Sequence, residues 1–321
     1  MHINGFWRNK SKDIKHFLIL NFYESFFYYS VPVFALSIGA TLLNFNEKYG
    51  LFEYNKKRFF KVFLPLLCWN IILYYYKAYF LKNLKKEKFN LINIWNFFFL
   101  SKVSHIFDSL HVFLLTYMLI PLISFVDKSK KITICIYYFF FLLITQAFIP
   151  YLINLFKLNI IWKYTFKIGY LIYIFAGYII HNYKFSNYQK SIIYIFGIIS
   201  FCIHFVGTLI CFYNKDKNLR LHKGYLNFPS IVYSCAIFLF IKENSYIISK
   251  RNYSKFVNKI GSLTLGPFFI HNTLNDTIGL YPKIFKIISF NTLLHSLFIF
   301  ILSLSISIIF KYVPILKYLV P

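Results

Sequence analysis

The sequence predicts an all-α, polytopic integral membrane protein with about nine transmembrane helices. Of its 321 residues, 58% are hydrophobic and 23% aromatic, whereas only 14% are charged. Soluble domains are nearer half apolar and about a quarter charged. The mean hydropathy is +0.56, and the apolar residues fall in long blocks. This composition excludes an ordinary soluble protein.

Each long apolar block is a candidate span, because a helix needs roughly 20 apolar residues to cross a bilayer. The loops between the blocks are rich in Lys, Asn and Ser, and none is long enough for a second folded domain. Residues 1–321 are therefore expected to form a single membrane-embedded domain. The predicted spans are 26–44, 59–80, 110–126, 132–150, 168–182, 191–213, 226–242, 262–281 and 290–312.

The longest predicted loops are 81–109 and 243–261. The apolar stretch 89–100 is too short to span and is predicted to lie at the membrane interface. At the amino terminus, the apolar run 17–22 is interrupted by Glu24. We therefore expect no signal peptide and no span there. Either the protein begins outside the membrane or its true start lies upstream.

The chain carries 36 Lys and Arg against 10 Asp and Glu, a formal charge of +26. In a soluble chain this would suggest nucleic acid. Here the basic residues cluster between apolar blocks, so the lipid bilayer is the predicted partner and nucleic acid is not. Only four of them are Arg, which indicates an AT-rich genome. Basic residues are nearly equal on the two sides, so charge bias does not set the orientation.

Ionisable residues inside a span are costly and are therefore functional candidates. None belongs to a motif of soluble enzymes, and neither the histidines nor the five cysteines show metal-ligand spacing, so no metal is expected. His204 and His295 have no partner nearby in the sequence and are expected to be structural. The candidates in or beside spans are Glu24, Asp108, His111, His204, His271, Asp276 and His295.

Two motifs near the amino terminus carry a family resemblance. Residues 31–40 read VPVFALSIGA, and residues 56–65 read KKRFFKVFLP, followed by Trp69. Together they resemble the second and third membrane segments of the acyltransferase 3 family, integral-membrane enzymes that acetylate surface glycans. Similar segments follow in the family's order at 111–121, 169–178, 260–271 and 313–317. The resemblance implies a ten-span fold of which the first span is missing here.

The resemblance also implies a general base. The family's first helix carries an Arg and, about ten residues later, a His regarded as catalytic. His2 lies 29 positions before Val31, about where that His falls, which implies that His2 is the base and that the helix with the Arg is absent from this chain. A histidine suits the role because its pKa lies near neutrality.

The family layout further implies a site for the donor, acyl-coenzyme A. Its phosphates cannot enter the bilayer, so a basic cluster at the cytoplasmic mouth is needed. Lys57, Arg58 and Lys61 fit this role, Arg58 best because its planar fork can bind phosphate bidentately. This layout places the loop 48–58 in the cytoplasm. A headgroup anchor at a helix end is the alternative interpretation of the cluster.

His111 and His271 are candidate pocket residues, with a hydrogen-bonded core histidine as the alternative for each. Pro32, Pro65 and Gly39 are interpreted as kink and packing residues that let helices approach closely.

The predicted function is transfer of an acetyl or short acyl group from acyl-coenzyme A to a hydroxyl of a cell-envelope polysaccharide or lipid-linked glycan precursor. The expected location is the bacterial cytoplasmic membrane, and no permanently bound cofactor is expected. Two alternatives stay open: a transporter or flippase for a glycan or lipid, which internal duplication would favour, and an inactive, truncated acyltransferase remnant.

Overall fold

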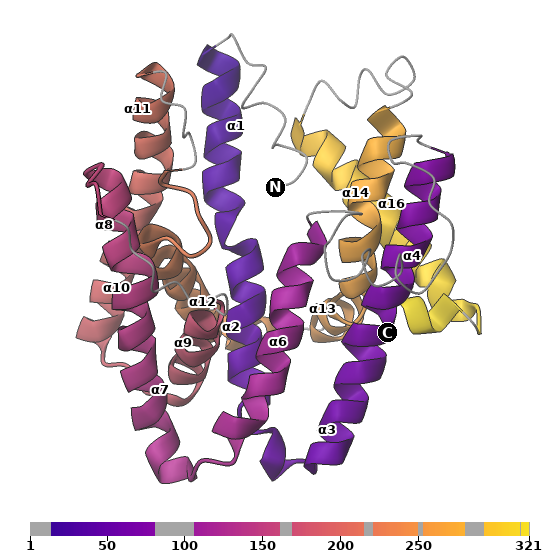
Figure 1. The fold of residues 1–321 in the computed structure, drawn as a ribbon, viewed down its shortest axis with the longest axis horizontal. Helices are drawn as coiled ribbons and strands as arrows, with labels where there is room; N and C mark the ends of the chain where they lie inside the picture. The colour runs from indigo at the N-terminus through magenta and orange to yellow at the C-terminus, as the bar shows by residue number, and fades with distance from the viewer. Residues whose placement is uncertain are drawn as a thin grey trace. The chain divides into compact units, whose positions relative to one another are not determined.

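A computed structural model describes residues 14–80, 106–160, 169–214, 221–249, 253–279, 292–314 and 316–320. These residues form helices and contain no β-strand (Figure 1). The chain divides into two compact units. Unit 1 consists mainly of Ile3–Gly50 and Leu115–Ile247, and unit 2 mainly of Leu51–Leu114 and Ile248–Pro321.

Unit 1 begins with a long helical rod, drawn in indigo in Figure 1. Helix α1 (Ile14–Phe26) runs through the 3₁₀ turn η2 (Phe27–Tyr29) into α2 (Ser30–Leu42). Residues Phe17–Glu47 are together long and apolar enough to cross a membrane. Helix α1 thus continues through Glu24, whereas an interruption of the apolar run was expected there, and the start of the first span near residue 26 stays a prediction. The reason that the helix continues is a distant ion-pair partner, described below.

The other helices of unit 1 include three further long helical rods and one shorter helix. The first joins α7 (Lys128–Leu142) to α8 (Ile149–Leu155) through the π-helical segment η5 (Leu143–Phe148). The second joins α10 (Asn187–Cys202) to α11 (Thr208–Tyr213) through the π segment η6 (Ile203–Gly207). The third is α12 (Phe228–Ser249), and the shorter α9 (Leu171–Asn182) lies against α2 and α7.

The crossing of α2 and α9 depends on one glycine from each helix. A methyl group added to Gly39 would lie 2.7 Å from the carbonyl carbon of Ile174, and one added to Gly177 would lie 2.7 Å from that of Leu36. Backbone therefore contacts backbone on both sides of the crossing, as small residues allow in membrane helices. This confirms the interpretation of Gly39 as a packing residue.

Lys131 of α7 is buried at the carboxyl ends of two helices. Its Nζ donates to the carbonyl oxygens of Leu43 (3.3 Å) and Ser124 (2.8 Å) and to Oδ1 of Asn44 (3.2 Å). Leu43 directly follows α2, and Ser124 is the last residue of α6 (Ile106–Ser124). Within α6, the residues up to Leu114 belong to unit 2 and those from Leu115 belong to unit 1. A cation at this position satisfies carbonyls that have no partner within their helices.

Replacing Lys131 with Met is expected to lower stability by about 1–3 kcal/mol, because two buried carbonyl groups lose their donor. Lys128→Met is the matched control, since Lys128 is exposed and only pairs with Glu47 at 3.3 Å. Thermal unfolding in detergent micelles, followed by circular dichroism, measures the difference. Equal midpoints for the two variants would contradict a capping role for Lys131.

Unit 2 contains a helix pair, a rod that packs with it and a short amphipathic helix. The rod joins α3 (Leu51–Arg58) to α4 (Leu64–Tyr79) through the π segment η4 (Phe59–Phe63), and the pair is α14 (Leu265–Gly279) with α16 (Thr292–Tyr312). Helix α13 (Tyr253–Gly261) lies within the predicted loop 243–261, which is a correction. Trp69 of α4 stacks on Phe269 and Phe310, with ring centroids 5.9 and 6.1 Å away.

Each of the nine predicted spans overlaps a helix in the described residues. By length and composition, five helical stretches there are able to cross a membrane, and His111–Ser124 and Leu171–Asn182 are shorter apolar helices. The protein is therefore an all-α polytopic membrane protein, whereas the count of nine spans stays a prediction. The interfacial stretch 89–100 lies outside the described residues. The five stretches are Phe17–Glu47, Leu51–Tyr79, Lys128–Leu155, Asn187–Tyr213 and Leu293–Tyr312.

Candidate functional site

The predicted donor cluster lies where α3 passes into η4. Lys57 is partly exposed, and its Nζ lies 2.7 Å from the carboxylate of Glu53, one turn earlier. The guanidinium carbon of Arg58 lies 5.6 Å from the ring centroid of Tyr54, which is fully buried. Lys61 is exposed. The structure thus brings Lys57, Arg58 and Lys61 to the start of one apolar rod, as spacing along a helix requires.

Glu53 and Tyr54 modify this cluster in ways that the sequence analysis missed. Glu53 offsets the charge of Lys57, so Lys57 contributes less positive charge to an anion site than its position in the sequence suggests. Tyr54 holds the guanidinium by a cation–π contact, which limits its rotamers. The signal was present in the sequence, because Glu53 and Tyr54 each lie four positions before their partners on one helix.

The two predicted pocket histidines belong to different helices of unit 2. Nδ1 of His271 lies 2.9 Å from the carbonyl oxygen of Pro267, one turn earlier in α14. Because a carbonyl only accepts, Nδ1 carries the proton and the neutral ring has its lone pair on Nε2. His111 is partly buried on α6. The side chain of its predicted neighbour Asp108 lies outside the described residues, as does the whole of His2.

A polar cluster inside unit 2 pairs residues of α4, α14 and α16. Nζ of Lys77 lies 3.3 Å from the carboxylate of Asp276, and the hydroxyl groups of Tyr76 and Thr277 lie 2.8 Å apart. Nε2 of His295 lies 3.0 Å from Oδ1 of Asn275. Polar side chains in apolar helices commonly find such partners. His295 is thus tied to α14, and its interpretation as structural stays a prediction.

A second cluster, in unit 1, surrounds a buried ion pair. Glu24 of α1 and Lys223 are each 2% exposed, and Nζ of Lys223 lies 3.1 Å from the carboxylate of Glu24. Nζ of Lys223 also donates to Oδ1 of Asn21, one turn before Glu24. The charge of Glu24 is therefore compensated inside the unit, which explains why it does not interrupt the helix.

Lys223 belongs to a non-helical segment, 221–227, that packs among the helices of unit 1. Three side chains donate to its backbone carbonyls: Tyr28 to Lys223 at 2.6 Å, Asn227 to Leu221 at 2.8 Å, and Tyr173 to Tyr225. A partly buried segment without helical hydrogen bonds needs such side-chain donors, and two of them, Tyr28 and Tyr173, come from outside the segment. The segment is therefore fixed in position by the surrounding helices.

Two histidines lie next to this segment. Nε2 of His204, within η6, lies 3.0 Å from the hydroxyl of Ser230. Nδ1 of His222 lies 2.9 Å from the hydroxyl of Tyr151, and burial lowers the pKa of His222, which favours the neutral ring. Gly207 leaves room for the ring of His222. The sequence analysis missed Lys223 and His222 because both lie in a predicted loop.

Chemically, the two units offer different groups. In the cluster of unit 1, the charge of Glu24 is compensated by that of Lys223, and both side chains are buried from solvent. Unit 2 offers exposed or partly exposed cations at Arg58 and Lys61, which can hold an anion. Among the residues that the structure describes, no group of three or more His, Cys, Asp or Glu side chains could hold a metal ion.

These features define the class: a multi-pass membrane protein with ion-paired polar clusters inside its helical units and a cationic cluster at the start of one apolar rod. A family model described as an acyltransferase domain matches residues 1–312. The chain therefore belongs to the acyltransferase 3 family and is an acyl-transferring enzyme. No curated protein and no solved structure matches the chain.

Proposed function

We propose that this enzyme transfers an acetyl or short acyl group from acyl-coenzyme A to a hydroxyl of a cell-envelope polysaccharide or a lipid-linked glycan precursor, in the bacterial cytoplasmic membrane. One observation carries the proposal. In a chain of an acyltransferase family, Arg58 and Lys61 place positive charge near the first residues of the apolar helical stretch Leu51–Tyr79. A donor that bears several phosphates and stays outside the bilayer needs such a site.

The proposed reaction needs a base and a fixed donor. His2 takes the proton of the acceptor hydroxyl as its oxygen attacks the thioester carbonyl carbon. The new ester bond forms, the carbon–sulfur bond breaks, and the proton passes from the imidazole to the departing thiolate of coenzyme A. His111 and His271 are proposed to contact the acceptor. The proton stays within the reacting groups, so no further cofactor is needed.

Arg58 is proposed as the principal phosphate contact for three reasons. Its neighbour Lys57 is already paired with Glu53. Its guanidinium is held over Tyr54, so less rotamer entropy is lost when a phosphate binds. Charged hydrogen bonds are also stronger than neutral ones. Lys61 adds charge at the same entry, although it is not held in this way.

Replacing Arg58 with Ala is expected to raise the KM for acyl-coenzyme A by about 10- to 100-fold, corresponding to the ~1.5–3 kcal/mol of a charged hydrogen bond. The value of kcat should change far less, because the phosphates lie away from the reacting carbonyl. Transfer of radiolabelled acetyl groups to cell-envelope glycan, in membranes that contain the protein, measures both constants.

Lys56→Ala is the matched control, since Lys56 is exposed and lies two positions before Arg58 on the same helix. It should leave KM within about threefold of wild type, as expected for a surface charge. An equal effect of the two substitutions would refute the donor site. Movement of glycan across the membrane without acyl transfer would favour the transporter instead, and no transfer by the folded protein would favour the inactive remnant.

A further inference from the structure

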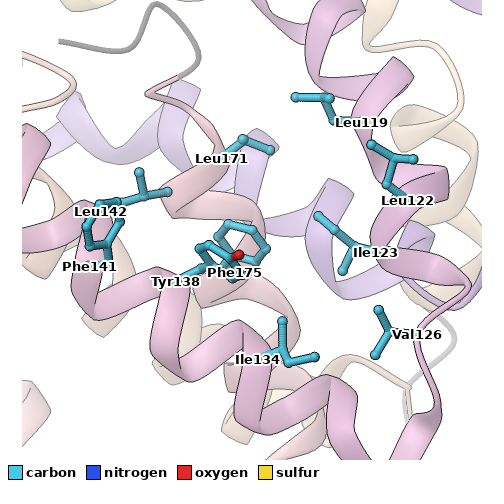
Figure 2. Close-up of a pocket in the computed structure, with 10 residues that line it drawn as sticks. All are labelled: Leu119, Leu122, Ile123, Val126, Ile134, Tyr138, Phe141, Leu142, Leu171 and Phe175. Atoms are coloured by element: carbon cyan, nitrogen blue, oxygen red, sulfur yellow. The ribbon is translucent and has the colours of Figure 1, made fainter. Parts of the chain in front are cut away.

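A groove of about 490 Å³ opens on unit 1 between α6, α7 and α9. Figure 2 shows the side chains of α6, including Leu122, facing those of α7, including Tyr138, with Phe175 of α9 between them. The lining is apolar except for the hydroxyl of Tyr138. The ring of Tyr138 stacks on that of Phe175, with centroids 5.8 Å apart, and Phe175 is 4% exposed.

The groove lies between helices that are apolar enough to lie in the membrane. Lys128–Leu155 is a candidate span, and His111–Ser124 and Leu171–Asn182 are shorter apolar helices. Leu122 is exposed, so the groove is open at its α6 wall. A hydrocarbon chain is the occupant that an apolar, open groove between such helices admits, because an apolar surface offers a headgroup or a sugar no hydrogen bonds.

One end of the groove carries positive charge. Ile134 lines the groove, and Lys130 lies one turn before it on the same face of α7. Lys130 is exposed and forms no ion pair with any residue that the structure describes. By contrast, Lys128 pairs with Glu47, and Nζ of Lys131 is bound to helix carbonyls. Residues 127–131 contain one acidic residue, Asp127, and three lysines, so the net charge at the start of α7 is positive.

We infer that this groove binds one acyl chain of an anionic phospholipid, with the lipid phosphate beside Lys130. The geometry matches such a lipid because the cation and the apolar groove follow one another along a single helix face. Lysines next to a membrane attract acidic lipids, at about 1 kcal/mol each. The lipid would fill the space that α6, α7 and α9 leave unfilled. The inference is independent of the acyl donor and acceptor.

Native mass spectrometry of the full-length protein tests this inference. The protein is stripped of lipid in detergent and then titrated with phosphatidylglycerol or with phosphatidylcholine of identical chains. Wild type should bind one phosphatidylglycerol about fivefold more tightly than phosphatidylcholine. Lys130→Gln should abolish this preference by weakening the binding of phosphatidylglycerol more than that of phosphatidylcholine, whose choline group already offsets its phosphate charge. Leu122→Trp, at an exposed position of the groove wall, should weaken binding of both lipids.

Two matched controls lie elsewhere on unit 1. Lys184→Gln removes an exposed lysine, and Ile198→Trp enlarges an exposed residue of α10. Both should bind as wild type does. Equal affinity of wild type for the two lipids, or unchanged binding by Leu122→Trp, would overturn the inference. Displacement of phosphatidylglycerol by a lower concentration of polyprenyl phosphate would also overturn it, since the occupant would then be an isoprenoid carrier.

Discussion

Glu24→Gln is expected to destabilise the protein by about 3–5 kcal/mol, because it removes one charge from a buried ion pair. The amide oxygen of Asn21, which stays as a partner of Nζ of Lys223, carries no charge that could replace the carboxylate. A loss of this size is a large part of the stability of most domains. The measurement is the midpoint of thermal unfolding in detergent micelles, followed by circular dichroism.

A double substitution separates the ion pair from the packing around it. Glu24→Leu with Lys223→Met removes both charges and keeps similar volumes, and such replacements of buried pairs are often neutral or stabilising. The double variant should therefore unfold at a higher temperature than Glu24→Gln.

Glu53→Gln is the matched control, because its pair with Lys57 is exposed on a helix surface. Its cost should stay below about 1 kcal/mol. A Glu24→Gln protein as stable as this control would show that the buried pair does not hold segment 221–227 in place.

Gly177→Ala is expected to cost at least about 3 kcal/mol, the upper end for overpacked interiors. The added methyl group would overlap the backbone carbonyl of Leu36, and backbone cannot move aside as a flexible side chain can. Gly39→Ala should act in the same way against Ile174. Either substitution should force α2 and α9 apart, and the yield of folded protein from membranes should fall.

Gly261→Ala is the control for these two substitutions. Gly261 belongs to a helix as well, as the last residue of α13, and a methyl group there would meet no atom within 4 Å. We expect a neutral or slightly stabilising change, since alanine favours helices over glycine by up to ~1 kcal/mol. If Gly177→Ala behaved like Gly261→Ala, the close crossing of α2 and α9 would be refuted.

Most of the helical organisation could be predicted from the sequence, because the length and hydropathy of a block are local properties. All nine predicted spans overlap helices for this reason. Residues 56–61 were likewise recognisable as a cationic cluster, since their charges are consecutive or one turn apart. The role of this cluster in donor binding and the catalytic role of His2 follow from the family resemblance alone, and both stay predictions. The single domain over residues 1–321 follows from composition, and it also stays a prediction.

The polar clusters could not be predicted, because their members are distant in the sequence. Glu24 and Lys223 are 199 positions apart, and His295 and Asn275 are 20 apart on separate helices. A hydropathy score counts the charge of Glu24 as unfavourable because it takes no account of distant partners. In the fold, Lys223 supplies the opposite charge from a segment whose composition predicts a loop. His204 lies in the π segment η6 and contacts the hydroxyl of Ser230. Neither the π segment nor this contact has a recognisable pattern in the sequence.

The π-helical segments η4, η5 and η6 affect any comparison of this chain with its relatives. A π turn accommodates one extra residue in an α-helix, so the positions on its two sides are out of phase by about 100°. A helical wheel drawn through Phe59–Phe63 from α3 would therefore assign the wrong face to α4. An alignment with a relative whose helix is regular there needs a one-residue gap within the span, even though insertions are normally sought only in loops.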